Sequence, residues 1–203
     1  MDTRERILTE ALELFSRQGY GGASVRDIAR AVGIRESSLY NHFPSKQAIF
    51  DGIVEQCLRQ AEDYFQAGGL PFDVGDDLSC YRGIGLEQLQ TLIEKTFRFF
   101  FDDPQNVRFR RLLLVSQFAD SRCRDLYRAL YRDKCIQVQA YIFSQLMEAG
   151  EMRREDPEAV AAEFHGPLFL LLHTCDSFAE AGPAIRAHVE QFRKNYQQAL
   201  RRD

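Results

Sequence analysis

Polar side chains that can bind phosphate or the edges of DNA bases are concentrated in one short segment near the N-terminus. The phenol of Tyr40, the imidazole of His42 and the ammonium of Lys46 can each hold a phosphate oxygen. The guanidinium of Arg35 suits guanine and the carboxamide of Asn41 suits adenine, each through two hydrogen bonds. This segment could therefore recognise nucleic acid through non-covalent contacts, provided that a fold presents these groups on one surface.

The sequence offers no comparable candidate for catalysis. It contains no Ser/His/Asp arrangement, glycine-rich phosphate loop or paired-carboxylate motif. His165 and His173 are two helical turns apart, roughly 12 Å along the axis, which is too far for one metal ion. We therefore predict no enzymatic activity, no cofactor and no bound metal. For Cys123, which lies between two arginines, a redox-sensing thiol of lowered pKa and an ordinary thiol both remain open.

Length and composition limit the class of protein. The 203 residues are 45% hydrophobic and 28% charged, the balance of a folded globular chain of one domain or two closely packed ones. No apolar stretch approaches the roughly 18 uninterrupted residues that a membrane helix needs. The charged N-terminus has no apolar run behind it, and the five scattered cysteines fit reduced thiols. We expect a cytoplasmic protein that does not span a membrane.

Charge is distributed unevenly along the chain. The net charge is −4, yet residues 1–50 carry seven Lys/Arg against six Asp/Glu, a balance of +1. The remaining residues carry nineteen against twenty-four, a balance of −5. The negative charge therefore lies outside the N-terminal segment, which is free to meet phosphate.

The elements that would position the polar segment are a long N-terminal helix and two short helices that follow it. The first begins after Asp2, an N-terminal cap, and ends at Gly19. The second is capped by Ser24 and closed by Gly33, and the third covers residues 36–43. A short helix, a glycine-containing turn and another short helix form the helix-turn-helix arrangement. On spacing alone, this pattern also fits other helical bundles.

The remaining sequence is predicted to be helical as well, which makes the fold class all-α. Residues 67–77 are too rich in Gly, Pro and Asp for a helix and form a linker. Gly182 and Pro183 are expected to separate the last two helices. The predicted helices after the third cover residues 46–66, 86–101, 104–118 and 121–147, followed by one that starts near residue 157 and a last one over residues 184–202.

A specific resemblance enters at the third helix. The pattern Leu-Tyr-x-His-Phe-x-x-Lys is formed by Leu39, Tyr40, His42, Phe43 and Lys46. Placed just after a helix and turn, it resembles the signature of TetR-family transcriptional regulators. Gly19-Tyr20, residues 24–29 and residues 31–34 are similar to the upstream parts of that family's DNA-binding domain. The resemblance covers about residues 5–50; the remainder agrees in length and helical character.

The resemblance implies a DNA-binding domain over residues 1–47 and a ligand-binding and dimerisation domain over residues 48–203. It implies a regulator, most often a repressor, that a small, largely apolar effector releases from palindromic double-stranded DNA. The candidate DNA-binding residues are Ser24, Arg26, Arg35, Glu36, Ser37, Ser38, Tyr40, Asn41, His42 and Lys46. Many members of the family carry a small residue such as glycine at the place of Ser37, so the close approach to DNA can differ here.

Alternatives remain for individual residues and for the whole chain. Glu36 also favours its helix N-terminus through the helix dipole, and Tyr40 also fits a seam between helices. The whole chain also fits an α-helical ligand-binding or adaptor protein that no longer binds DNA. Salt dependence of DNA binding distinguishes these classes.

In the C-terminal region the resemblance implies an effector pocket and a homodimer through the last two helices. The helix from residue 159 is apolar nearly all round, so it must be covered on all sides, which fits a partner subunit. Aromatic and histidine side chains there fit the lining of an apolar cavity, although such a stripe also fits a plain core. The candidate ligand-binding residues are Phe97, Phe101, Phe118, Tyr141, His165, Phe169 and His173.

Overall fold

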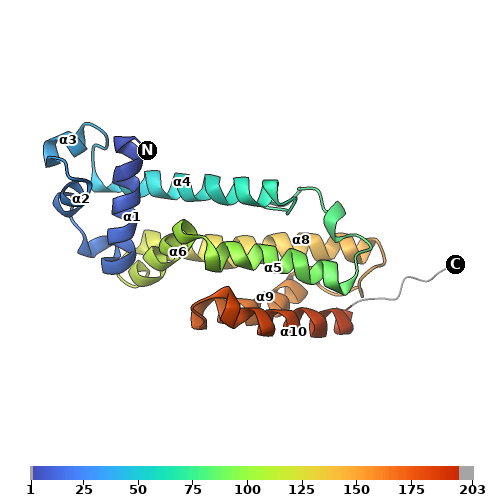
Figure 1. The fold of residues 1–203 in the computed structure, drawn as a ribbon. Coiled ribbons are helices and arrows are strands. Elements are labelled where there is room, and N and C mark those ends of the chain that lie inside the picture. Colours follow the sequence, from blue (N-terminus) through green and yellow to red (C-terminus); the bar gives the residue numbers. More distant parts are fainter. Residues whose placement is uncertain (1, 197–203) are drawn as a thin grey trace. The chain divides into compact units, whose positions relative to one another are not determined.

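The computed structural model describes residues 2–196, which fold into helices with no β-strand element among them (Figure 1). This confirms the predicted all-α fold class. The described residues form two compact units. Unit 1 contains the residues up to Ala61 together with Pro104–Arg128, and unit 2 contains Glu62–Asp103 and the residues from Ala129 onward. The predicted functional boundary between residues 47 and 48 stays a prediction.

Unit 1 holds the N-terminal helices and two helices from the middle of the chain. Its elements are α1 (Thr3–Gly22), α2 (Val25–Val32), α3 (Glu36–Tyr40), the first part of α4 (Lys46–Ala67), α6 (Pro104–Ser116) and α7 (Ser121–Arg128). Helix α6 packs against α1, where Arg108 forms an ion pair with Glu13. The core of unit 1 is formed by the fully buried side chains of Ile7, Phe15, Ile28, Leu39, Ile49, Ile53, Leu112, Leu113 and Cys123.

Local sequence signals fix the ends of the first two helices. The Asp2 carboxylate accepts the backbone N–H of Glu5 at 2.7 Å, and the Glu5 carboxylate accepts that of Asp2. The predicted end at Gly19 is a kink: φ is +75° there, but the helix resumes and continues to Gly22. Gly33 closes α2 in the left-handed conformation that glycine adopts without strain.

Unit 2 is built from the later helices. Its elements are the end of α4, a 3-10 turn η1 (Ser79–Tyr81), α5 (Leu86–Asp102), a π-helical turn η2 (Ala129–Asp133), α8 (Lys134–Glu148), α9 (Pro157–Thr174) and α10 (Phe178–Tyr196). Helix α8 packs against α9, and α10 packs against α5 and α9. The predicted helix over residues 121–147 is thus two α-helices joined through a π-helical turn.

The predicted break at Gly182 and Pro183 is wrong. Both residues lie inside α10, and α9 ends eight residues before Gly182, at Thr174. The Ser177 hydroxyl accepts the Glu180 N–H at 3.3 Å, and the Glu180 carboxylate accepts the Asp176 N–H at 2.9 Å. This start signal outweighs the proline, which costs one hydrogen bond early in the helix. The predicted end of that helix, at residue 202, lies outside the described residues.

Candidate nucleic-acid interface

The exposed surface of α2 and α3 is held in place by two buried side chains. Leu39 is fully buried and Phe43 is 3% exposed, so α3 is fixed through its inner side. The polar residues predicted to bind DNA occupy its other positions and the start of α2. Of the ten, only Ser38 and Lys46 are half-buried; the other eight are exposed. The 47% exposed side chain of Tyr40 places its ring on the surface rather than in a helix seam.

The start of α2 is occupied by its own cap. The Ser24 hydroxyl donates to the Asp27 carboxylate at 2.5 Å and accepts the Asp27 backbone N–H at 3.2 Å. This hydrogen bond from Ser24 lowers the pKa of Asp27, with Arg30 and Arg26 contributing. Ser24 is therefore already engaged, and a phosphate at this helix end would meet a carboxylate beside it. The phosphate-binding role of Ser24 stays a prediction.

Two arginines of α1 were missed by the sequence reasoning. The Arg6 guanidinium donates to the backbone carbonyl of Val32 at 2.6 Å, at the end of α2. The Arg4 guanidinium lies 4.9 Å from the centre of the Phe43 ring, just after α3. Both side chains add positive charge next to the helix-turn-helix. The sequence feature that could have identified them is the pair of basic residues at positions 4 and 6, just before the apolar face of α1.

Lys46 begins α4 and does not extend freely into solvent. Its Nζ lies 4.3 Å from the centre of the Tyr20 ring and 5.5 Å from that of Phe15. Partial burial lowers the pKa of Lys46, and the Asp120 carboxylate opposes this shift. The predicted phosphate-binding ammonium thus rests on an aromatic surface within unit 1.

The candidate effector residues of unit 2 lie partly in an aromatic series made of two runs of rings, which meet where His165 contacts the Tyr131 carbonyl. Ring centres lie 6.0 Å apart between Phe97 and Phe100, 6.0 Å between Phe100 and Tyr131, and 5.7 Å between His165 and Phe169. The series continues from Phe169 to His173 at 4.2 Å. Phe101 packs instead against Phe178, and Tyr141 is half-buried on α8.

The prediction that Phe118 lines the effector pocket is wrong. Its side chain is 93% exposed and belongs to unit 1, just after α6. The reason is that α6 ends at Ser116, before Phe118 can share its inner face. Phe118 therefore does not join the aromatic series of unit 2.

His165 is the most unusual polar residue of unit 2. It is 6% exposed, and its Nε2 lies 2.9 Å from the Tyr131 carbonyl in the π-helical turn. Because a carbonyl only accepts hydrogen bonds, Nε2 carries the proton and Nδ1 is an acceptor. Nδ1 is buried without a hydrogen-bond partner among the described residues. Burial lowers the pKa of His165, which keeps the imidazole neutral.

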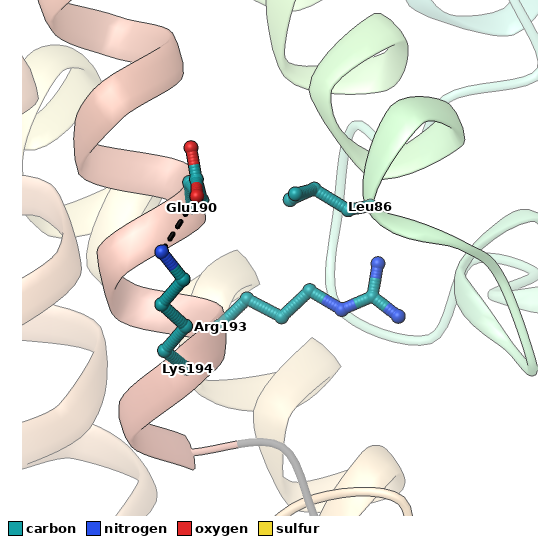
Figure 2. Close-up of a pocket in the computed structure, with 4 residues that line it drawn as sticks. All are labelled: Leu86, Glu190, Arg193 and Lys194. Carbon is teal, nitrogen blue, oxygen red and sulfur yellow. Dashed lines mark hydrogen bonds and ion pairs between the residues drawn. The ribbon is translucent and has the colours of Figure 1, made fainter.

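A surface cleft of about 220 Å³ lies elsewhere in unit 2 (Figure 2). Leu86 of α5 and Glu190, Arg193 and Lys194 of α10 line it. The Lys194 ammonium pairs with Glu190 at 2.6 Å, and the Arg193 guanidinium donates to the Ile84 carbonyl at 3.1 Å. The cleft contains none of the predicted effector residues.

The structure also bears on a redox-sensing thiol at Cys123, on metal binding and on membrane insertion. Cys123 is 1% exposed, and burial raises the pKa of its thiol to about 11, opposite to a redox-sensing thiolate. Residues 2–196 contain no group of three or more potential metal ligands in reach of one ion. None of the described helices is long and apolar enough to cross a membrane.

A short helix, a glycine turn and a second short helix with exposed polar residues define a helix-turn-helix protein. Residues 7–53 match the family described as "Bacterial regulatory proteins, tetR family". Over 54 residues the chain is 43% identical to the biofilm operon icaADBC HTH-type negative transcriptional regulator IcaR of Staphylococcus aureus (strain Newman). That alignment covers 27% of this chain and 29% of IcaR. The sequence similarity to the TetR family thus covers the N-terminal region of this chain, and the chain spans less than a third of the length of IcaR.

Solved structures extend the likeness of fold to the whole chain. The SmeT–triclosan complex matches with a TM-score of 0.70 at 17% identity, over 98% of this chain and 94% of SmeT. AibR in complex with isovaleryl coenzyme A and operator DNA matches with a TM-score of 0.64 at 19% identity, over 92% of this chain and 97% of AibR. The shared fold is a helix-turn-helix domain joined to a larger helical region.

Proposed function

We propose that the protein is a sequence-specific DNA-binding transcriptional regulator, and specifically a repressor. The observation that carries this proposal is the set of eight exposed polar residues on α2, α3 and the following turn, held in place by buried Leu39 and Phe43. IcaR is a negative regulator, and AibR is known with operator DNA. In this chain, Arg35, Glu36, Ser37 and Asn41 would read bases while the flanking residues hold phosphates. Such a regulator works in the cytoplasm.

The proposed effector is a small, largely apolar molecule with a hydrogen-bond donor, bound in unit 2. The aromatic series around Phe100, Tyr131 and Phe169 supplies apolar contacts. The buried Nδ1 of His165 supplies one acceptor that a hydroxyl or N–H of the ligand would satisfy. SmeT, whose fold matches this chain, is known in complex with triclosan, which supports a small-molecule ligand for this chain.

The proposed assembly is a homodimer through α9 and α10. Besides Glu158, Glu163 and Thr174, the exposed positions of α9 carry small or apolar residues, which are Ala159, Ala162, Gly166, Pro167 and Leu170. Leu170 is 61% exposed, and water-facing apolar residues in a row favour burial against another protein surface. A two-fold dimer presents two copies of α3 to successive major grooves, so the operator should be a palindrome.

Selection of bound sequences from random duplex DNA, at two salt concentrations, tests the proposed function. An enriched palindrome, with affinity that falls steeply as salt rises, is the expected result. If neither salt concentration enriches any sequence, the proposal is wrong. The chain would then be a helical ligand-binding or adaptor protein.

A further inference from the structure

The Tyr20 ring occupies a fixed position in unit 1. The kink at Gly19 turns the Tyr20 backbone N–H toward the Ser116 hydroxyl, which accepts it at 2.9 Å. The ring makes edge contacts with Phe15 and Phe50, with centres 5.4 and 5.2 Å away. Tyr20 therefore forms a rigid platform between α1, α4 and the end of α6.

Two cations use this platform. The Lys46 ammonium lies 4.3 Å and the Arg122 guanidinium 5.1 Å from the centre of the Tyr20 ring. Cations at such distances from an aromatic ring are attracted by the negative potential of its face. Lys46 comes from the first position of α4, whereas Arg122 comes from α7. The platform thus joins the start of α4 to the α6–α7 corner, defined as residues 117–122.

Asp120 adds a fixed negative charge at the same corner. Its carboxylate accepts two hydrogen bonds from the Arg122 guanidinium, at 2.8 and 3.2 Å, and one from the Arg122 backbone at 2.9 Å. The side chain of Asp120 is only 19% exposed. Burial lowers the pKa of Lys46, and the negative charge of Asp120 opposes that shift in part. Lys46 and Arg122 both lie against the Tyr20 ring, so the Asp120 carboxylate that binds Arg122 is near the Lys46 ammonium without forming an ion pair with it among residues 2–196.

We propose that the α6–α7 corner competes with DNA for Lys46: Tyr20 and Asp120 hold the ammonium back, and a DNA phosphate must draw it away. This inference rests on the proposed function, because it takes Lys46 to be a phosphate contact. The ammonium is one point charge on a flexible stem, so the fraction of time that it spends on the Tyr20 platform is unavailable for phosphate binding. Tyr20, Asp120 and Arg122 are positioning residues, and the corner sets DNA affinity without touching DNA.

A matched pair of variants tests the competition. Asp120→Asn and Asp125→Asn each remove one negative charge from unit 1. Asp125 pairs only with its neighbour Arg124 among the ion pairs of residues 2–196, and its side chain is 65% exposed. The DNA probe is the duplex enriched by selection, titrated at several salt concentrations. We expect Asp120→Asn to bind roughly two- to fivefold more tightly than Asp125→Asn, the range of one partly exposed charge contact.

The same pair in a Lys46→Met background identifies Lys46 as the group that is released. There the advantage of Asp120→Asn over Asp125→Asn should vanish. An equal effect of both substitutions with Lys46 present, or an advantage that persists without it, overturns the inference. Should the wild type bind while Lys46→Met weakens binding, this failure leaves the proposed function standing. A wild type that binds no duplex contradicts both.

A second measurement guards against loss of structure in Asp120→Asn, because Asp120 also caps α7. In the free protein the ε-methylene protons of Lys46 should show an upfield ring-current shift from Tyr20, and Tyr20→Leu should abolish it. Adding the enriched duplex to the wild type should reduce the shift. A shift unchanged by saturating DNA would mean that Lys46 stays on the ring, which overturns the inference whatever the stability of the variants.

Discussion

At the scale of single residues, phosphate contacts and base contacts should be distinguishable by their response to substitution. Lys46→Met should weaken binding to every duplex by a similar factor and reduce the salt slope by about one, because one phosphate no longer meets a cation. Asn41→Ala should reduce discrimination at one position of each half-site, by about 1–3 kcal/mol. Competition titrations with the operator and its single-base variants measure both effects. A uniform weakening for both variants would contradict the assigned roles.

His165 carries a prediction about pH. Its pKa is lowered in the folded protein, so the unfolded chain takes up a proton more readily. The stability that its neutral form provides is present at pH above the unfolded pKa of about 6.5 and is lost as the pH falls through and below it. Urea titrations between pH 7.5 and 5 should show a smaller decline in unfolding free energy for His165→Gln than for the wild type. Equal declines would show that His165 is not the group responsible.

The sequence was informative for residues whose role depends on local chemistry and uninformative where distant segments meet. Exposed Arg35 and Asn41 follow from the helix-turn-helix pattern, because spacing alone fixes which positions face away from Leu39. The Arg6 contact with the Val32 carbonyl joins positions 26 residues apart, and no periodicity signals it. Phe118 was misplaced because aromatic character suggested burial, while the end of α6 at Ser116 left it exposed.

At the scale of elements, the proposed dimer rests on the exposed side of α9. Leu170→Glu places a charge in the proposed apolar interface, and burying it unpaired would cost several kcal/mol per subunit. Sedimentation should therefore show a dimeric wild type and a largely monomeric variant at micromolar concentration. Gln66→Glu, at an exposed position of α4, is the charge-matched control and should stay dimeric. If the Leu170→Glu variant stays dimeric, the dimer interface does not include this side of α9.

Element boundaries were predictable at the capping residues and at Gly33, but not at Gly19, where the helix resumes after a kink. Asp2 and Ser24 cap the starts of α1 and α2, and the left-handed Gly33 ends α2, as the sequence indicates. The start of α10 is set by the Ser177–Glu180 cap, whereas the prediction rested on Gly182 and Pro183 alone. A proline early in a helix removes one hydrogen bond, whereas an unsatisfied helix start leaves several N–H groups without partners, so the cap prevails.

At the scale of the whole molecule, the proposed repressor must couple effector binding to DNA binding by thermodynamic linkage. An effector releases the operator only to the extent that it binds the DNA-free form more tightly than the DNA-bound form. A donor-bearing apolar compound, found by its stabilisation of wild-type protein and not of His165→Phe, should lower operator affinity by some factor.

Operator DNA should then lower the affinity for that compound by the same factor, because the two measurements close one cycle. Calorimetric titrations of the compound into free and operator-bound protein determine one side, and DNA titrations with and without the compound determine the other. Typical coupling of about 1–3 kcal/mol corresponds to roughly 5- to 150-fold. A compound that binds both forms equally would leave the operator occupied at any concentration, and would show that unit 2 binds ligands without controlling DNA.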